Sequence, residues 1–217
     1  MNLEDTLQDE EIRFGVVDTG VANLASVMAS LRRVGVRADL VSTSVEVERV
    51  DGLVLPGVGH FASGMSELRR LGLVESIRER VRRRSATLAI CLGTQLLADS
   101  SDEAPGVAGL GAIDVQVRRL AACAPRPHVG WSRIDRPFLR TEDVVVRPGT
   151  AYFANGYALD RVPDGWAATW ACDGDRFVAS LECSGVVACQ FHPELSGIYG
   201  QDLIRRWVAC VKDVVSC

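Results

Sequence analysis

The 217-residue sequence has little of several features that would place it in other classes of protein. Lys212 is its only lysine, so arginine supplies almost all of the positive charge, and the net charge is −4. A chain of that charge is not expected to bind nucleic acid through phosphate contacts. No apolar run approaches the roughly 20 residues that a membrane helix needs. We therefore expect a soluble protein that binds neither nucleic acid nor membrane.

The sequence also lacks a paired cysteine motif and a targeting signal. Its seven cysteines cannot all pair, and none stands in the C-x-x-C spacing of a zinc or redox site. Cys189 and His192 resemble half of a metal site, but an odd separation along a strand puts them on opposite faces. Residues 1–11 are acidic and contain no apolar segment, so they do not form a secretory signal. We expect a reduced, cytoplasmic protein without metal or cofactor, with residues 1–11 as a flexible leader.

The composition is that of an ordinary globular domain, with 47% hydrophobic and 24% charged residues. No internal repeat, low-complexity tract or linker interrupts residues 12–217, so we predict a single domain there. The basic run at 78–84 is expected to end a helix, because cations complement the negative end of the helix dipole.

The first half of the chain alternates between short apolar runs and helical periodicity. The apolar runs predict strands at 12–17, 36–41, 51–55 and 86–90. Apolar residues at helical spacing predict helices at 24–34 and 61–83, and a further helix is expected over 94–98. This order, with short connections, indicates an α/β fold with a mostly parallel twisted sheet flanked by helices.

From Ile113 onward short strands dominate. Alternating patterns predict strands at 113–120, 143–147, 151–157, 166–172, 176–183 and 185–191. We expect antiparallel strands added at one side of the sheet, with a return into it. A last amphipathic helix at about 199–213 is predicted to bury five apolar side chains, those of Leu203, Ile204, Trp207, Val208 and Val211.

The rest of the chain is organised around the run from Leu88 to Leu97. A buried strand leads through a tight turn into a helix, with Cys91 at the turn and Gly93 two residues later. This pattern is typical of a nucleophile elbow, with cysteine in place of serine, and exposes the central side chain at the carboxyl edge of the sheet. The N-terminus of the new helix favours a thiolate there. Free buried cysteines are common and usually inert, so this segment alone leaves both interpretations open.

The segment from Cys189 to Glu194 favours the catalytic interpretation. The strand at 185–191 ends at His192, and residues two apart in an extended chain share a face, so Glu194 would lie beside the imidazole. Pro193 favours an extended conformation at His192. A carboxylate fixes the tautomer of an imidazole, which can then serve a thiol as base. With Cys91, these residues predict a triad rather than a surface histidine beside an incidental glutamate.

Taken together, these segments resemble the class I (triad) glutamine amidotransferases, and among them the glutaminase subunits of imidazole glycerol phosphate synthase. The resemblance covers nearly the whole chain beyond residue 11. Its motifs are Asp18 to Leu24, Asp51 to Gly59, the elbow, Gly109 to Gly111, Pro127 to Trp131 and Gln190 to Glu194. It implies a flavodoxin-like α/β fold with added antiparallel strands.

The resemblance also implies a mechanism for the three triad residues. The Cys91 thiolate would attack the side-chain amide of glutamine, and His192 would protonate the departing ammonia. Glu194 would hold the imidazole, and water would then cleave the thioester to release glutamate.

Further site residues follow from the same resemblance. The N–H groups of Leu92 and Val58 would form the oxyanion hole, with Gly57 permitting the peptide flip that the hole requires. Three residues, Gly59, Gln95 and Glu103, would contact the substrate, although a solvated loop carboxylate is the alternative for Glu103.

The implied partner is a (β/α)₈-barrel cyclase subunit, docked over the active site to form a heterodimer and receiving ammonia through its barrel. The residues that match interface positions are Asn23, His128, Trp131 and Tyr157. A half-buried core tryptophan is the alternative for Trp131.

Four departures from the family pattern leave other interpretations open. The glycine-rich segment ends Val21-Ala22-Asn23, the His-Ser-Tyr motif is Asn155-Gly156-Tyr157, the first elbow glycine is Ala89, and Leu195 replaces a lysine that pairs with the cyclase. None removes a catalytic group. A paralogous subunit that supplies ammonia to another synthase, in amidinated-sugar or specialised metabolism, is therefore the main alternative.

Two more distant alternatives are disfavoured by particular residues. A glutaminase of pyridoxal phosphate synthase would carry Gly-Gly-Glu-Ser where this chain has Pro56 to Gly59. A catalytically silent or redox-sensing flavodoxin-like domain would not need His192 and Glu194.

Overall fold

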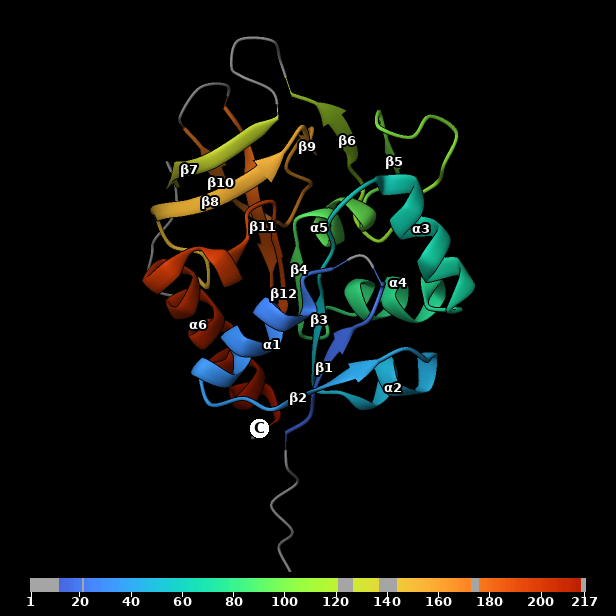
Figure 1. The fold of residues 1–217 in the computed structure, drawn as a ribbon, viewed down its shortest axis with the longest axis vertical. Coiled ribbons are helices and arrows are strands. Elements are labelled where there is room, and N and C mark those ends of the chain that lie inside the picture. Colours follow the sequence, from blue (N-terminus) through green and yellow to red (C-terminus); the bar gives the residue numbers. More distant parts are fainter. Residues whose placement is uncertain (1–11, 21, 121–126, 137–143, 173–175, 216–217) are drawn as a thin grey trace, which may run out of the picture.

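The computed structural model describes residues 12–20, 22–120, 127–136, 144–172 and 176–215, which form two sheets flanked by helices (Figure 1). The larger sheet has nine strands in the order β2-β1-β3-β4-β12-β11-β10-β7-β8, and the smaller has the order β5-β6-β9. The predicted leader at 1–11 lies outside the described residues. Within the described ranges, no helix is long and apolar enough to cross a membrane.

One half of the large sheet is parallel, as predicted. Strand β1 pairs with β2 and β3, β3 pairs with β4, and β4 pairs with β12. The elements of this half are β1 (Phe14–Val17), α1 (Leu24–Arg33), β2 (Ala38–Val41), α2 (Ser44–Arg49), β3 (Gly52–Leu55), β4 (Thr87–Ile90), α5 (Leu92–Leu96) and β12 (Val186–Cys189). Every residue of β1, β3, β4 and β12 is buried, so apolar runs without alternation identified these strands.

Two helices of this half differ from the prediction. Helix α2 was not indicated by apolar spacing, and its sequence signal is a capping box. The Glu46 N–H donates to the Thr43 hydroxyl, and the Thr43 N–H donates to the Glu46 carboxylate. Helix α5 begins at Leu92, directly after the cysteine, and not at Thr94.

The prediction of one long helix at 61–83 is wrong. The chain forms α3 (Phe61–Arg70) and α4 (Val74–Arg82), separated by a turn at Gly72 with φ +69°. A glycine in the left-handed region ends the first helix. The apolar spacing continues through the turn because both helices pack on the same cluster, which contains Leu68 and Ile77. The basic run does end a helix, with Arg80 and Arg82 in the last turn of α4.

The other half of the large sheet is antiparallel, also as predicted. From β12 outward each strand pairs antiparallel with the next. The strands are β11 (Phe177–Cys183), β10 (Ala167–Ala171), β7 (His128–Asp135) and β8 (Gly149–Asn155). The small sheet contains β5 (Ser100–Ser101), β6 (Gln116–Arg119) and β9 (Tyr157–Leu159).

In this half one strand prediction is wrong and one strand was not predicted, each for a physical reason. The part of 143–147 that is described is not a strand. There the N–H groups of Val145 and Val146 donate to the Glu182 carboxylate, so a side chain replaces a strand partner. Strand β7 was missed because its pattern is inverted: Val129 and Trp131 face outward, whereas Ser132 is buried.

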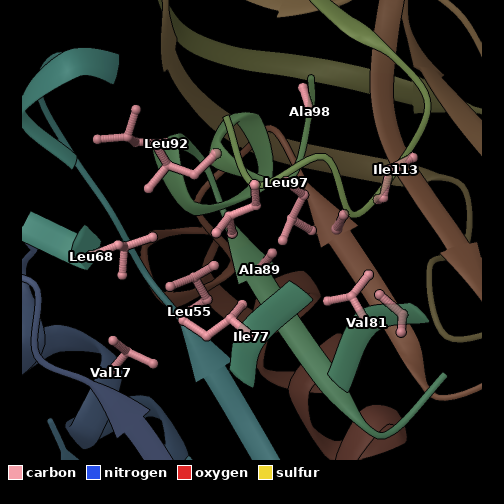
Figure 2. Close-up of a cluster of buried hydrophobic side chains, with 14 of the residues drawn as sticks. Val17, Leu55, Leu68, Ile77, Val81, Ala89, Leu92, Leu97, Ala98 and Ile113 are labelled. Carbon is pink, nitrogen blue, oxygen red and sulfur yellow. The ribbon is translucent and has the colours of Figure 1, made fainter. Parts of the chain in front are cut away.

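The core lies on both faces of the sheet. On one face Leu55, Ala89 and Leu92 pack beneath α3 and α4 (Figure 2). On the other face Leu88 packs with Trp207 of α6 (Gly197–Val215). All five apolar residues predicted to be buried on the last helix are buried. Because neighbouring residues of β4 anchor in opposite clusters, this strand is a fixed platform for the residue that follows it.

Candidate active site

Cys91 stands between the last residue of β4 and the first residue of α5. Its backbone has φ 51° and ψ −109°, in a region that non-glycine residues rarely occupy. The Cys91 N–H donates to the Cys189 carbonyl at 2.7 Å, and the Gln95 N–H donates to the Cys91 carbonyl at 3.2 Å. The predicted strand, turn and helix are all present, and they hold the cysteine at the carboxyl edge of the sheet.

The elbow depends on a glycine and a threonine that follow the cysteine. A Cβ atom at Gly93 would lie 1.9 Å from the Leu55 carbonyl oxygen, so only glycine lets α5 approach β3 this closely. The Thr94 hydroxyl lies 3.1 Å from the Ala89 carbonyl and 2.8 Å from the Cys189 carbonyl. Gly93 therefore packs α5 on β3, and the Thr94 hydroxyl links β4 to β12 beneath the cysteine.

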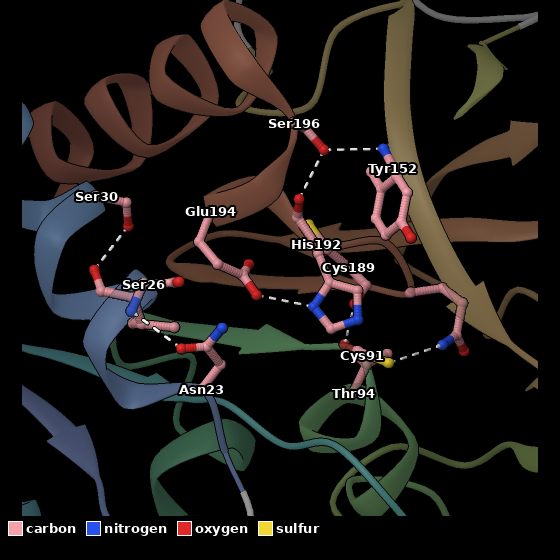
Figure 3. Close-up of polar contacts among 12 residues, drawn as sticks. Asn23, Ser26, Ser30, Cys91, Thr94, Tyr152, Cys189, His192, Glu194 and Ser196 are labelled. Carbon is pink, nitrogen blue, oxygen red and sulfur yellow. Dashed lines mark hydrogen bonds and ion pairs between the residues drawn. The ribbon is translucent and has the colours of Figure 1, made fainter. Parts of the chain in front are cut away.

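His192 and Glu194 follow β12, the strand next to β4, and form a buried pair (Figure 3). The His192 Nδ1 and Glu194 Oε1 atoms are 2.8 Å apart. The extended conformation predicted through Glu194 is wrong beyond His192, because Pro193–Leu195 form a 3₁₀ turn closed by the Leu195 N–H donating to the His192 carbonyl. The predicted contact forms nonetheless, because the turn brings the carboxylate back to the ring.

The backbone of His192 is held by a residue that the sequence analysis did not identify. The Ser196 hydroxyl donates to the His192 carbonyl at 2.6 Å and accepts the Tyr152 N–H at 2.9 Å (Figure 3). The His192 N–H in turn donates to the Tyr152 carbonyl at 2.9 Å. Strand β8 thus fixes the backbone of His192. The only sign of this contact in the sequence was a serine two residues after the His-Pro-Glu segment.

The electrostatics of the site favour a charged imidazole. Burial acts to lower the pKa of His192, but hydrogen bonds with Cys91 and with Glu194 outweigh it and raise the pKa from 6.5 to about 10. Cys91 and His192 line the same cavity at the carboxyl edge of the sheet. All three predicted triad residues therefore come together.

The predicted oxyanion donors do not converge in this structure. The Leu92 N–H donates to the Gly57 carbonyl at 3.2 Å. That carbonyl belongs to the same peptide group as the Val58 N–H, the second predicted donor. The Leu92 N–H is therefore occupied by the carbonyl of the Gly57–Val58 peptide, the same peptide group that carries the Val58 N–H.

A cavity of about 150 Å³ adjoins Cys91 and His192. The remaining residues that line it come from four separate segments: Val58, Gly59, Leu92, Gln95, Glu103, Ala154, Asn155, Gly156 and Tyr157. All three predicted substrate-binding residues are among them. Within the described residues, no cluster of three or more His, Cys, Asp or Glu side chains could hold a metal ion.

Polar side chains in the cavity are held in place by hydrogen bonds. Glu103 Oε2 accepts the Phe61 N–H at 2.7 Å and so caps α3, which is not the behaviour of a solvated loop carboxylate. Asn155 Nδ2 donates to the Tyr157 carbonyl at 3.0 Å. Its Oδ1 atom is buried without a hydrogen-bond partner among the described residues. Asn155 is a candidate binding residue that the sequence analysis treated only as a departure from a motif.

The four predicted interface residues differ in exposure. Trp131 is 56% exposed on the outward face of β7, so it is not a core tryptophan. Asn23 is exposed and caps α1 by accepting the Ser26 N–H. His128 is half-buried and hydrogen-bonded to Ser132. Tyr157 is half-buried in the cavity wall.

Comparison with known proteins defines the class. The family model for class-I glutamine amidotransferases matches residues 15–209. The chain belongs to the class I glutamine amidotransferase family, and the sequence resemblance is confirmed at that level.

Curated relatives within this class carry a more particular name. The chain is 36% identical over 208 residues to the imidazole glycerol phosphate synthase subunit HisH of Symbiobacterium thermophilum, covering 94% of this chain and 97% of that one. It is 36% identical over 195 residues to the protein of the same name from Yersinia pseudotuberculosis, covering 89% and 97%.

Solved structures confirm the fold. A crystal structure of a glutamine amidotransferase superposes with a TM-score of 0.74 at 21% identity, covering 92% of this chain and 98% of that one. A glutamine amidotransferase from Thermotoga maritima gives 0.59 at 16% identity, with 94% and 84% covered. The predicted flavodoxin-like α/β fold is therefore correct.

Proposed function

We propose that this glutamine amidotransferase hydrolyses glutamine to glutamate and ammonia with Cys91, His192 and Glu194 as its catalytic triad. The observation that carries the proposal is the buried His192–Glu194 pair, 2.8 Å apart, whose imidazole lines the same cavity as Cys91 at its strained elbow. Nucleophile, base and orienting carboxylate in that order are the arrangement that acyl transfer requires.

The proposed reaction has two stages. The Cys91 thiolate adds to the side-chain carbonyl carbon of glutamine, and His192 gives its proton to the nitrogen as the C–N bond breaks and ammonia leaves. A γ-glutamyl thioester remains on Cys91. Water then gives a proton to the neutral imidazole and adds to the thioester, which releases glutamate and restores the thiolate–imidazolium pair.

The oxyanion hole is proposed to form by one movement. Rotation of the Gly57–Val58 peptide would remove the Gly57 carbonyl from the Leu92 N–H and bring the Val58 N–H to the same side. Both donors would become available together. Since loss of one such donor typically costs about 3 kcal/mol of transition-state stabilisation, the unrotated site would be nearly inactive.

Substrate recognition is assigned to the polar lining of the cavity. Gln95 and Glu103 would contact the polar groups of glutamine, and Gly59, with φ +96°, would let the chain pass close to the substrate. Because Glu103 also caps α3, this carboxylate would link substrate binding to the segment that follows Gly59.

We propose that the acceptor of the ammonia is a (β/α)₈-barrel cyclase subunit, and that the pair is a cytoplasmic imidazole glycerol phosphate synthase of histidine biosynthesis. Support comes from the names of the relatives and from the length matched in each. The exposed residues Asn23 and Trp131, the half-buried His128 and the cavity-wall residue Tyr157 would contact the heterodimer partner or lie next to it.

A second candidate function is favoured by the surface near the triad. Leu195 is 41% exposed and Ile198 is 79% exposed, and Gly197 between them lies next to the ring of Trp131. This apolar rim would suit a partner other than a histidine-pathway cyclase, in a paralogous complex that supplies ammonia to a different synthase.

Two experiments test these proposals. A diazoketone analogue of glutamine should label Cys91 alone, as detected by peptide mass spectrometry; labelling that persists in Cys91→Ala would refute the assigned nucleophile.

Expression of the chain in a strain that lacks this subunit should restore growth without histidine. Failure to grow, with the protein folded and expressed, would favour the paralogous complex.

A further inference from the structure

Gln190 carries a buried carboxamide that the proposed triad does not use. Its side chain is 1% exposed, and its N–H donates to the Ala179 carbonyl at 2.8 Å, which fixes its backbone to β11. Its Nε2 atom lies 3.8 Å from the Cys91 sulfur. Its Oε1 atom lies 3.0 Å from Gln95 Nε2.

We propose that Gln190 is a positioning residue that donates an N–H to the Cys91 sulfur and fixes the direction in which the Gln95 carboxamide faces the substrate. This inference rests on the proposed function and extends it, because it links the nucleophile to the substrate-binding residue through one side chain.

The direction of both carboxamides follows from one carbonyl. Gln95 Nε2 donates to the Tyr157 carbonyl at 3.0 Å, because an amide oxygen in that place would face another oxygen. Its second N–H then meets Gln190, which must present Oε1. The Nε2 atom of Gln190 is thereby left facing the sulfur. The order Tyr157, Gln95, Gln190, Cys91 admits only this assignment.

The arrangement has a consequence for the thiolate. Gln190, the residue directly after β12, supplies an N–H donor to the sulfur in addition to the imidazolium of the proposed triad. A neutral N–H at this distance is a weaker donor than an imidazolium, but it does not bring a further charge into the buried site. It stabilises the thiolate over the thiol and holds the sulfur in one rotamer.

The arrangement also determines what Gln95 recognises. Both N–H groups of Gln95 are used within the protein, so only its Oε1 remains to face a ligand. An amide oxygen accepts hydrogen bonds and cannot donate them. Gln95 is therefore expected to contact an N–H group of glutamine, either its ammonium or its carboxamide nitrogen.

Two substitutions separate the two roles. Gln190→Met removes both the donor to sulfur and the acceptor for Gln95 at similar volume. Gln190→Glu keeps an acceptor for Gln95 and replaces the donor with a carboxylate oxygen. Gln201→Met, on α6 and partly exposed, is the matched control.

The first measurement is the pH midpoint of Cys91 alkylation by iodoacetamide, which follows the thiolate fraction. We expect about tenfold slower alkylation of Gln190→Met at pH values below the wild-type midpoint, and a larger loss in Gln190→Glu. The control should match the wild type. An unchanged midpoint in either folded Gln190 variant would overturn the proposal, because a merely structural role would change the melting temperature and leave the midpoint in place.

The second measurement is the concentration of glutamine diazoketone that half-saturates Cys91 labelling. It should rise severalfold in Gln190→Met and stay near the wild-type value in Gln190→Glu. Equal increases in both variants would exclude the role in orienting Gln95. Iodoacetamide does not resemble glutamine, so the pH midpoint of its reaction tests Gln190 independently of substrate binding. If the wild type did not react with the diazoketone, that result would refute the glutaminase proposal alone.

Discussion

One carboxylate oxygen of Glu194 contacts the His192 imidazole, and the other is buried without a hydrogen-bond partner among the described residues. The carboxylate therefore acts on the ring through a single contact and through its charge. Both effects raise the pKa of His192, and together with the contribution of Cys91 they outweigh the effect of burial.

Glu194→Gln tests this charge. The amide keeps nearly the same shape and can still accept from Nδ1, but it no longer stabilises the positive ring. We expect the rate of glutamine hydrolysis to fall by about 10²-fold or more, as with other triads that lose their carboxylate. Steady-state ammonia release, measured with Glu75→Gln on the surface of α4 as control, checks it; a loss below threefold would contradict the assigned role.

The raised pKa of His192 also predicts how stability depends on pH. The folded pKa of about 10 exceeds the unfolded value of 6.5, so the stabilisation by charged His192 is complete below pH 6.5. It is lost as the pH rises from 6.5 toward 10, because the folded protein then holds a proton that the unfolded chain has released.

Urea unfolding of the wild type and of His192→Asn across pH 6 to 10 measures this effect. The difference in unfolding free energy between the two proteins should shrink as the pH rises. A difference that stays constant or grows would show that the folded pKa of His192 is not raised.

At the scale of single elements, the elbow relies on close contact between α5 and β3. Gly93→Ala would place a methyl group 1.9 Å from the Leu55 carbonyl oxygen, which the backbone can relieve only by moving α5 away. We expect about 3 kcal/mol of destabilisation or more, together with slower labelling of Cys91.

Gly156→Ala is the control for this prediction, because a Cβ atom at Gly156 meets nothing within 4 Å. Thermal unfolding of both variants makes the comparison. Equal melting temperatures would mean that the approach of α5 to β3 is less tight than the structure indicates.

A buried ion pair joins Arg136, the residue directly after β7, to Glu182 of β11. Arg136 Nη1 and Glu182 Oε1 are 2.6 Å apart, and the same carboxylate accepts the N–H groups of Val145 and Val146. Removal of either partner leaves an uncompensated buried charge, so Arg136→Met or Glu182→Leu should each cost about 3–5 kcal/mol.

The double variant Arg136→Met with Glu182→Leu should cost clearly less than the sum of the two single changes, because no lone charge remains buried. Urea unfolding of the four proteins completes this cycle. Strict additivity would show that the two side chains do not depend on each other.

At the scale of the whole molecule, the resting site is incomplete because the Gly57 carbonyl occupies the Leu92 N–H. We expect the isolated chain to hydrolyse glutamine slowly and the proposed cyclase partner, with ligand bound, to accelerate the reaction by 10²-fold or more. Brisk turnover by the chain alone would count against a partner-dependent flip.

A substitution of the exposed Trp131 tests where that partner binds. Trp131→Ala should weaken assembly with the cyclase, measured by analytical ultracentrifugation, by tenfold or more, since a central aromatic residue typically dominates an interface. Ile12→Ala is the control, because Ile12 is partly buried just before β1, and β1 lies toward the lower end of Figure 1 whereas β7 lies at the upper end. Unaltered affinity in Trp131→Ala would place the interface elsewhere.

Much of this architecture was predictable from local pattern. The buried parallel strands were found because apolar runs have no polar interruption, and α6 because its buried residues recur every three or four positions. The break at Gly72 and the inverted pattern of β7 were not predictable in the same way. One depends on which backbone angle a glycine adopts, and the other on which face of the strand the sheet covers.

The sequence by itself determined the class of fold and predicted the three residues of the proposed triad, because a strand–turn–helix around Cys91 and the His-Pro-Glu segment are local signals of chemistry. Only the tertiary structure decided that Gly57 closes the oxyanion site, that Glu103 caps α3 and that Gln190 links Cys91 to Gln95. Each of those facts is a hydrogen bond between residues about 35 to 100 positions apart, and such a contact has a direction and a length only after the sheet has brought its partners together.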